Sequence, residues 1–190
     1  MEKIVFLSSS DFVAETNAAR YITKIITKEK PLKVLSCFER MKDQLNSFCM
    51  TNVGMSSFSQ EDFQHKTLYP LLSGYKSTMT NLDPNWWKFE LEKYIESITE
   101  SIPDVVRFLF TECSSSEMID LACERDYLIL RAQGTSTAED SSGHISLESF
   151  RVLSKKCRVE SFCIDNDRHH TQQEDINEDQ LSKISKIICK

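Results

Sequence analysis

The sequence lacks long apolar runs and clusters of positive charge. No segment approaches the roughly 20 apolar residues that a membrane-spanning helix requires, so we expect no membrane partner. No run of five or more lysines and arginines occurs, and the net charge of −6 disfavours nucleic acid as a partner. The first apolar run is too short for a secretory signal and continues into a charged helix, so we expect an intracellular protein.

Paired cysteine motifs are also missing. The seven cysteines are an odd number, and no two of them are spaced as C-x-x-C. Most lie in apolar runs, where a reduced cysteine acts as a small core residue, so we expect a reducing compartment, cytoplasm or nucleus. A metal site built from His169 and His170 with Cys157 or Cys163 lacks the paired spacing of zinc ligands, so we predict no metal site.

Glycine and proline are scarce, at four residues each among 190, and the remaining composition is that of a globular protein. The length suits one domain over residues 1–190 with a buried core. Short apolar runs alternate with helical patterns, which predicts an α/β fold with a parallel sheet of about five strands flanked by helices. The expected strands are 3–8, 33–38, 105–110, 127–131 and 159–164, and the expected helices are 15–29, 39–50, 67–79, 86–100, 116–125, 146–155 and 177–189. Small polar residues over 133–147 predict a mobile loop.

The junction between the first strand and the first helix has the length of a phosphate-binding loop without its glycines and lysine. On the spacing G-x-x-x-x-G-K-[ST], Ser9 and Ala14 occupy the glycine positions and Glu15 the lysine position, and only Thr16 fits. A carboxylate opposes phosphate charge by about 1 kcal/mol at ~4 Å even in water. We expect Glu15 to be a solvated first-turn carboxylate that favours the helix dipole, and Thr16 to be a helix-end hydroxyl rather than a magnesium ligand.

Five short motifs occur in a familiar order. They are Phe6-Leu7-Ser8, then Phe38 with Met41-Lys42-Asp43-Gln44-Leu45, then Leu71-Leu72 and Gly74 followed by Asp83-Pro84-Asn85-Trp86-Trp87, then Phe108-Leu109-Phe110-Thr111-Glu112, and finally Ile164-Asp165-Asn166-Asp167. In order and spacing the chain resembles the P-loop nucleoside monophosphate kinase family, especially its phage-type deoxynucleoside monophosphate kinases and animal-type phosphomevalonate kinases. The resemblance covers nearly the whole chain and implies a three-layer P-loop kinase-like fold, with 133–147 as a remnant of the lid.

The chain departs from the family where the family places its chemistry. The resemblance puts Glu112 at the strand-end aspartate, Ser114 at the arginine that follows, and segment 133–147, which has no Lys or Arg, at the arginine-rich lid. With Glu15 in the place of the lysine, all three expected sources of positive charge are missing. Phosphoryl transfer depends on positive charge around the phosphate, so we predict a pseudoenzyme with no catalytic residue and no cofactor.

A possible residual anion site remains at Arg40 and Lys42, just past the second strand. The resemblance places the acceptor phosphate of these kinases there, although a solvated helix face explains both residues equally well. If this site binds a ligand, the protein is an active or ligand-sensing nucleotide or small-molecule kinase with a rearranged phosphate site, which is the alternative hypothesis.

The leading hypothesis is an inactive nucleotide-kinase-like domain retained as a protein-interaction subunit, a scaffold in a homodimer or a hetero-complex. Trp86 and Trp87 are possible interface residues, because tryptophan is enriched at binding hot spots. Adjacent helical positions cannot both face inward, so one of the two should be partly exposed. The polar-aromatic stretch around Phe58 and Phe63 is the other possible interface.

Overall fold

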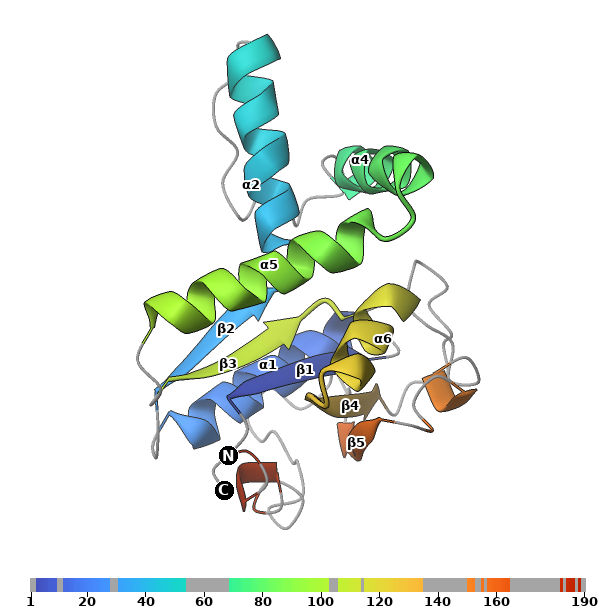
Figure 1. Ribbon diagram of the computed structural model, residues 1–190. Coiled ribbons are helices and arrows are strands. Elements are labelled where there is room, and N and C mark those ends of the chain that lie inside the picture. Colours follow the sequence, from blue (N-terminus) through green and yellow to red (C-terminus); the bar gives the residue numbers. More distant parts are fainter. Residues whose placement is uncertain are drawn as a thin grey trace. The chain divides into compact units, whose positions relative to one another are not determined.

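The structure is a computed structural model, and it describes residues 3–9, 12–27, 31–53, 69–102, 106–113, 115–134, 150–152, 155, 157–164, 182, 184–186 and 188. The chain divides into two compact units. Residues 1–36 and 101–190 form the first, here called the sheet unit, and residues 37–100 form the second, the helical unit. Along the sequence, the helical unit lies between the second and third strands (Figure 1).

Five parallel strands make up the sheet. They are β1 (Ile4–Ser9), β2 (Leu32–Ser36), β3 (Arg107–Thr111), β4 (Leu128–Gly134) and β5 (Arg158–Ile164), and their order in the sheet is β2-β3-β1-β4-β5. In the register, Val5 lies opposite Leu109 of β3 on one side and Leu128 of β4 on the other. The predicted α/β fold with a five-stranded parallel sheet flanked by helices is confirmed.

Both faces of the central strands are apolar, as expected for buried parallel strands. On one face Val5 and Leu7 pack with Ile22 and Ile26 of α1 (Phe12–Ile26). On the other face the ring of Phe6 stacks on Phe110 and Tyr127, at centroid distances of 5.3 and 5.9 Å. Figure 1 shows α1 and α6 (Ser116–Glu124) on opposite sides of the sheet. Each fully buried side chain of this size contributes about 1.5–3 kcal/mol of transfer free energy.

The helical unit contains α2 (Glu39–Phe48), the π-helix η1 (Cys49–Val53), α4 (Tyr69–Leu82) and α5 (Trp86–Ser101). A carboxylate oxygen of Asp83 accepts the backbone N–H of Asn85 at 2.9 Å, in the turn that leads into α5. Inside the unit, Trp87 stacks on Phe38 with ring centroids 5.2 Å apart. The π-helical continuation of α2 was not expected from the sequence.

Several predicted segments fall partly or wholly outside the described residues. In the predicted loop 133–147, residues 133 and 134 belong to β4 and the remainder lies outside. The predicted helix 146–155 is helical at 150–152, and the predicted helix 177–189 is helical at 182, 184–186 and 188. The other predicted strands and helices agree with the structure to within about three residues at each end.

One pair of cysteines differs from the prediction of reduced thiols. Cys123, on the last turn of α6, forms a disulfide with Cys157, and their Cα atoms are 4.7 Å apart. The fold brings the end of α6 to the start of β5, which the separation of 34 residues does not reveal. Of the other described cysteines, Cys37, Cys49, Cys113 and Cys163 take part in no disulfide.

Within the described segments, no helix is both long and apolar enough to cross a membrane.

Candidate functional site

A cluster of polar side chains lies where β1, β3 and β4 approach the carboxyl edge of the sheet. β1 lies between β3 and β4, so the order of strands reverses direction at this point. In open α/β sheets, the crevice outside such a reversal is the usual place for a ligand. The strand-end cluster consists of Ser8, Ser9, Glu15, Glu112, Cys113 and Arg131.

Arg131 is the cation of the strand-end cluster and is only 1% exposed. It lies opposite Ser8 in the β1–β4 register. Its Nη1 donates to the Ser8 hydroxyl at 2.7 Å and to the Ser9 carbonyl at 3.0 Å. Its guanidinium carbon lies 4.5 Å from the ring centroid of Phe150, a cation–π contact. Arg131 therefore holds the end of β1 in place and is itself fixed from two sides.

Glu15 is the buried acid of the strand-end cluster. It lies on the first turn of α1, and one of its carboxyl oxygens accepts the backbone N–H of Glu112. The backbone N–H of Cys113 also bonds to this carboxyl group. Two successive backbone donors at a strand end form the kind of concave site that binds anions in other proteins. Here the protein's own side chain fills it.

Burial raises the pKa of Glu15 from its ordinary value of 4.5 to about 8. The negative charge of Glu112 adds to the increase, whereas Arg131 and the two backbone N–H groups oppose it. Glu15 is therefore mostly protonated and neutral at pH 7. The same burial lowers the pKa of Arg131, against the effects of Cys113 and Glu15.

Glu112 connects the cluster to β2 through an uncommon backbone conformation. Its φ is 61°, in the left-handed region that side chains other than glycine rarely adopt. Its carboxylate accepts the hydroxyl of Ser36, the last residue of β2, while its N–H donates to Glu15. Nearby, Thr111 donates its hydroxyl to the carbonyl of Leu35 at 3.2 Å. Such a conformation costs about 1–3 kcal/mol and persists only where surrounding contacts hold it.

The predicted phosphate-loop positions behave differently from one another. Ser9 and Ala14 are buried, at 1% and 0% exposure, and Thr16 is exposed to solvent. The prediction that Glu15 is a solvated carboxylate is wrong, since Glu15 is 4% exposed. The reason is its position: the first turn of α1 meets the end of β3, and that pairing is not visible in the local sequence. Ser114 lies outside the described residues.

The two residues of the predicted residual anion site, Arg40 and Lys42, have different surroundings. Arg40 donates from its Nε to a carboxylate oxygen of Glu90 at 2.9 Å, and Gln44 donates to the same oxygen at the same distance. Lys42 is 5% exposed, so the solvated-face interpretation is wrong for it. Arg40 and Lys42 are two residues apart on α2, and side chains with this spacing do not face each other.

The two tryptophans predicted as interface residues differ in their exposure. Trp87 is buried at 1% exposure, which removes it as a contact residue, whereas Trp86 is partly exposed. The expectation that one of the two would be partly exposed is confirmed. Phe58 and Phe63 lie outside the described residues.

Arg131 is the functional candidate that the sequence did not reveal. It ends the predicted strand 127–131, where a charged residue is ordinarily read as the solvent-exposed end of the strand. An arginine directly after a run of three apolar residues was the available signal.

Among the described residues, no group of three His, Cys, Asp or Glu side chains is placed to hold a metal ion.

Comparisons with known proteins add little. No protein-family model matches the chain, and no curated protein matches it. The solved crystal structure of APE1195 is similar at 13% sequence identity and a TM-score of 0.34, covering 99% of this chain and 95% of that chain. This similarity is too low to indicate a function. The fold and the site define an α/β protein with a parallel five-stranded sheet, and the kinase family stays a prediction.

Proposed function

We propose that this chain is a catalytically inactive, nucleotide-kinase-like domain that works as a protein-interaction subunit. The observation that carries the proposal is the burial of Glu15 in the anion-binding position of the sheet. Its carboxyl group accepts hydrogen bonds from the backbone N–H groups of Glu112 and Cys113. In a phosphate-binding protein such donors would face the phosphate. A phosphate would have to displace an internal acid from a buried site before it could bind.

Arg131, the cation of the strand-end cluster, is also held by contacts within the protein. Arg131 holds Ser8 and the Ser9 carbonyl and stacks on Phe150, so binding a phosphate would cost these interactions. Away from the cluster, Arg40 pairs with Glu90. Both arginines are held by contacts within the protein, which disfavours the alternative of a kinase or nucleotide sensor that uses either of them to bind a phosphate.

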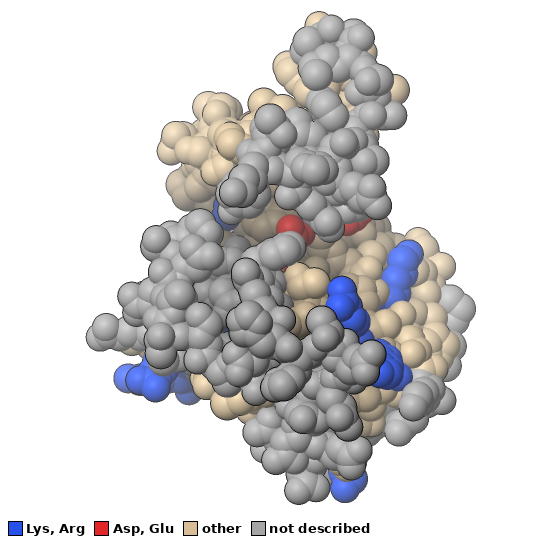
Figure 2. Space-filling model, turned by 180° about the vertical axis from the view of Figure 1, so that it is seen from behind, with Lys and Arg blue, Asp and Glu red and all other residues tan. Residues whose placement is uncertain are grey.

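Exposed apolar side chains support the interaction role. Seven large apolar residues of the described chain are exposed, and five of them lie in the helical unit: Phe48, Met50, Leu71, Leu82 and Phe89. On the side shown in Figure 2, the described Lys and Arg side chains lie in small separate groups. Exposed apolar side chains together with a net charge of −6 fit a protein partner better than a nucleic acid.

Two measurements test the proposal. Thermal shift and calorimetry with ATP and magnesium, and with several nucleoside monophosphates, should show neither stabilisation nor heat of binding. ATP-dependent stabilisation would favour the sensor, and product formation in the same mixture would establish the kinase and reject the proposal. Gentle purification of the untagged native protein, followed by crosslinking and mass spectrometry, should recover a protein partner or a second copy of the chain.

A further inference from the structure

The outward side of α4 carries no charge. The helix YPLLSGYKSTMTNL has a single charged residue, Lys76, whose ammonium lies 5.7 Å from the ring centroid of Phe38. In the chain as a whole 27% of residues are charged. The exposed residues of α4 are instead apolar, small or uncharged: Pro70, Leu71, Ser73, Gly74, Ser77, Thr78, Asn81 and Leu82.

The inward side of α4 is anchored within the helical unit. Leu72 is buried, the ring of Tyr75 packs edge-on against Trp86 at 5.8 Å, and the Tyr75 hydroxyl donates to the side-chain oxygen of Gln44 at 3.4 Å. Leu71 and Leu82 are therefore left on the outward side, 43% and 77% exposed. Together with Gly74 and Thr78 they form one stripe at helical spacing, here called the outer strip.

No contact among the described residues explains Gly74, in the middle of the outer strip. A Cβ added there meets no atom within 4 Å, and the residue has an ordinary helical conformation. Glycine in an exposed helix interior costs about 1 kcal/mol relative to alanine. Glycine does, however, allow another backbone to approach closely.

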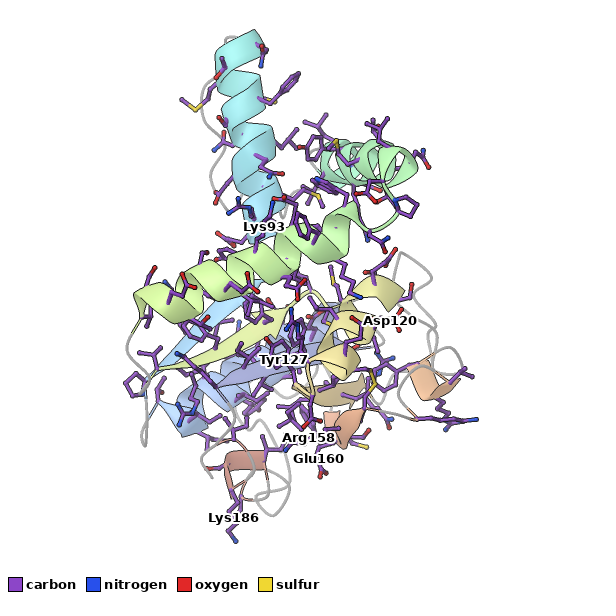
Figure 3. All side chains as sticks on the ribbon, viewed as in Figure 1. Lys93, Asp120, Tyr127, Arg158, Glu160 and Lys186 are labelled. Atoms are coloured by element: carbon purple, nitrogen blue, oxygen red, sulfur yellow. A yellow bond between two sulfur atoms is a disulfide. The ribbon has the colours of Figure 1, made fainter. Side chains whose placement is uncertain are left out.

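An exposed apolar side chain on α5 has a different environment from those of the outer strip. Phe89 on α5 is 54% exposed, but the ammonium of Lys93 lies 4.1 Å from its ring centroid and 3.6 Å from a carboxylate oxygen of Glu90 (Figure 3). A charged side chain thus covers this apolar surface, as long lysine stems commonly do. The outer strip of α4 has no such neighbour on its own helix.

We propose that the outer strip packs against the outer strip of a second copy of this chain, with the two α4 helices antiparallel about a two-fold axis. The strip is nearly symmetric in sequence: an antiparallel pair sets Leu71 against Leu82 and Gly74 against Thr78, so leucines meet at both ends and small residues in the middle. Two copies with a net charge of −6 each repel one another, and the outer strip is a surface where they can meet without opposing like charges.

This inference rests on the proposed interaction role and names its partner. The dimer should be weak: α4 has 14 residues and is about 21 Å long at 1.5 Å per residue, and one helix pair buries less than the roughly 1,200 Å² of standard complexes. Association should therefore depend on protein concentration over the micromolar range.

Sedimentation equilibrium over a wide concentration range tests the inference on the full chain. The weight-average mass should rise from 22.0 kDa towards twice that value as the concentration increases. Leu82→Lys and Gly74→Leu should each weaken association at least tenfold. Val152→Lys is the matched control, because Val152 is 61% exposed and belongs to the sheet unit, and it should associate like the wild type.

Thermal unfolding of dilute protein separates association from folding. Gly74→Leu should keep or raise the melting temperature, since leucine is a better helix former and finds open space there. A chain that stays monomeric at every concentration, or a dimer unaffected by Leu82→Lys and Gly74→Leu, would overturn the inference. A monomer that co-purifies with a different protein rejects self-association and leaves the proposed function standing, whereas ATP turnover rejects the proposed function itself.

Discussion

The carboxyl group of Glu15 accepts the backbone N–H of Glu112, a residue 97 positions later in the chain. This hydrogen bond joins the first turn of α1 to the residue after β3, at the place where related architectures commonly bind ligands. It makes the carboxyl group of Glu15 part of the folded core. It also makes Glu15 a titratable group whose protonation is linked to folding.

Replacing Glu15 with glutamine should remove a pH dependence of stability. The pKa of Glu15 is about 8 in the folded state against an ordinary value of 4.5, so between these pH values the unfolded chain releases a proton that the folded protein keeps. Wild-type stability should therefore fall as pH rises from about 4.5 to 8, by up to about 1.4 kcal/mol per pH unit from this group, and then level off. Denaturant unfolding from pH 5 to 9 measures this slope.

Glu15→Gln should show a much smaller slope than the wild type, because the amide oxygen still accepts the N–H of Glu112 and has no charge to gain. Glu96→Gln is the control, since Glu96 is an exposed carboxylate on α5. Equal slopes in Glu15→Gln and the wild type would show that Glu15 is not the buried acid described above.

Replacing Arg131 with methionine should destabilise the fold by about 3 kcal/mol or more. The variant loses the hydrogen bonds to Ser8 and Ser9 and leaves their oxygens buried without this donor. Because Arg131 holds the pKa of Glu15 down, the upper end of the pH window should also move upward. Arg158→Met is the matched control: Arg158 is half-exposed and 4.0 Å from Asp126, so its loss should cost less than about 1 kcal/mol. Comparable losses in both variants would contradict the structural role of Arg131.

Breaking the disulfide between Cys123 and Cys157 should lower stability by about 3–4 kcal/mol, as expected from the chain entropy of a loop that closes 34 residues. The double variant Cys123→Ser, Cys157→Ser should melt at the same temperature with and without a reductant, while the wild type should melt lower in the reductant. Cys163→Ser removes an exposed free thiol and should follow the wild type in both conditions. Two free thiols at positions 123 and 157 in the purified protein, by alkylation and mass spectrometry, would contradict the link.

Truncating the core of the central strands should be costly. Leu109 on β3 is fully buried between β1 and β2, so Leu109→Ala should lose about 2–5 kcal/mol through lost burial and the cavity left behind. Val152→Ala, at a side chain 61% exposed, should change stability by about 0.5 kcal/mol or less. Urea unfolding at one pH gives both values, and a small loss for Leu109→Ala would place β3 outside the core.

The local parts of this fold were readable from the sequence, and the site was not. Continuous apolar runs predicted β1 and β3, and helical spacing predicted α5. The position of Glu15 depends on β3 reaching the start of α1, and the position of Arg131 depends on β4 pairing with β1. Both are contacts between residues about a hundred or more positions apart. Local periodicity holds no information about such pairs.

Adjacent tryptophans show the same limit on a smaller scale. The rule that neighbours on a helix face different directions correctly separated Trp86 from Trp87. It could not say which of them stacks on Phe38, because that contact belongs to the packing of α5 within the helical unit. The ion pair of Arg40 was hidden from the sequence for a related reason, since Glu90 lies 50 residues from Arg40.

The insertion of residues 37–100 between β2 and β3 has a consequence for how the chain reaches its fold. β2 and β1 each pair with β3, so Leu32 must meet Arg107 and Ile4 must meet Phe108 across the whole inserted unit. Closing such long loops costs entropy before any strand contact repays it, which slows folding. β4 and β5 are closer in sequence, with Leu128 opposite Arg158, and form the most local pair in the sheet. During synthesis β1 and β2 therefore leave the ribosome long before β3. Their edges stay unpaired until β3 has been made.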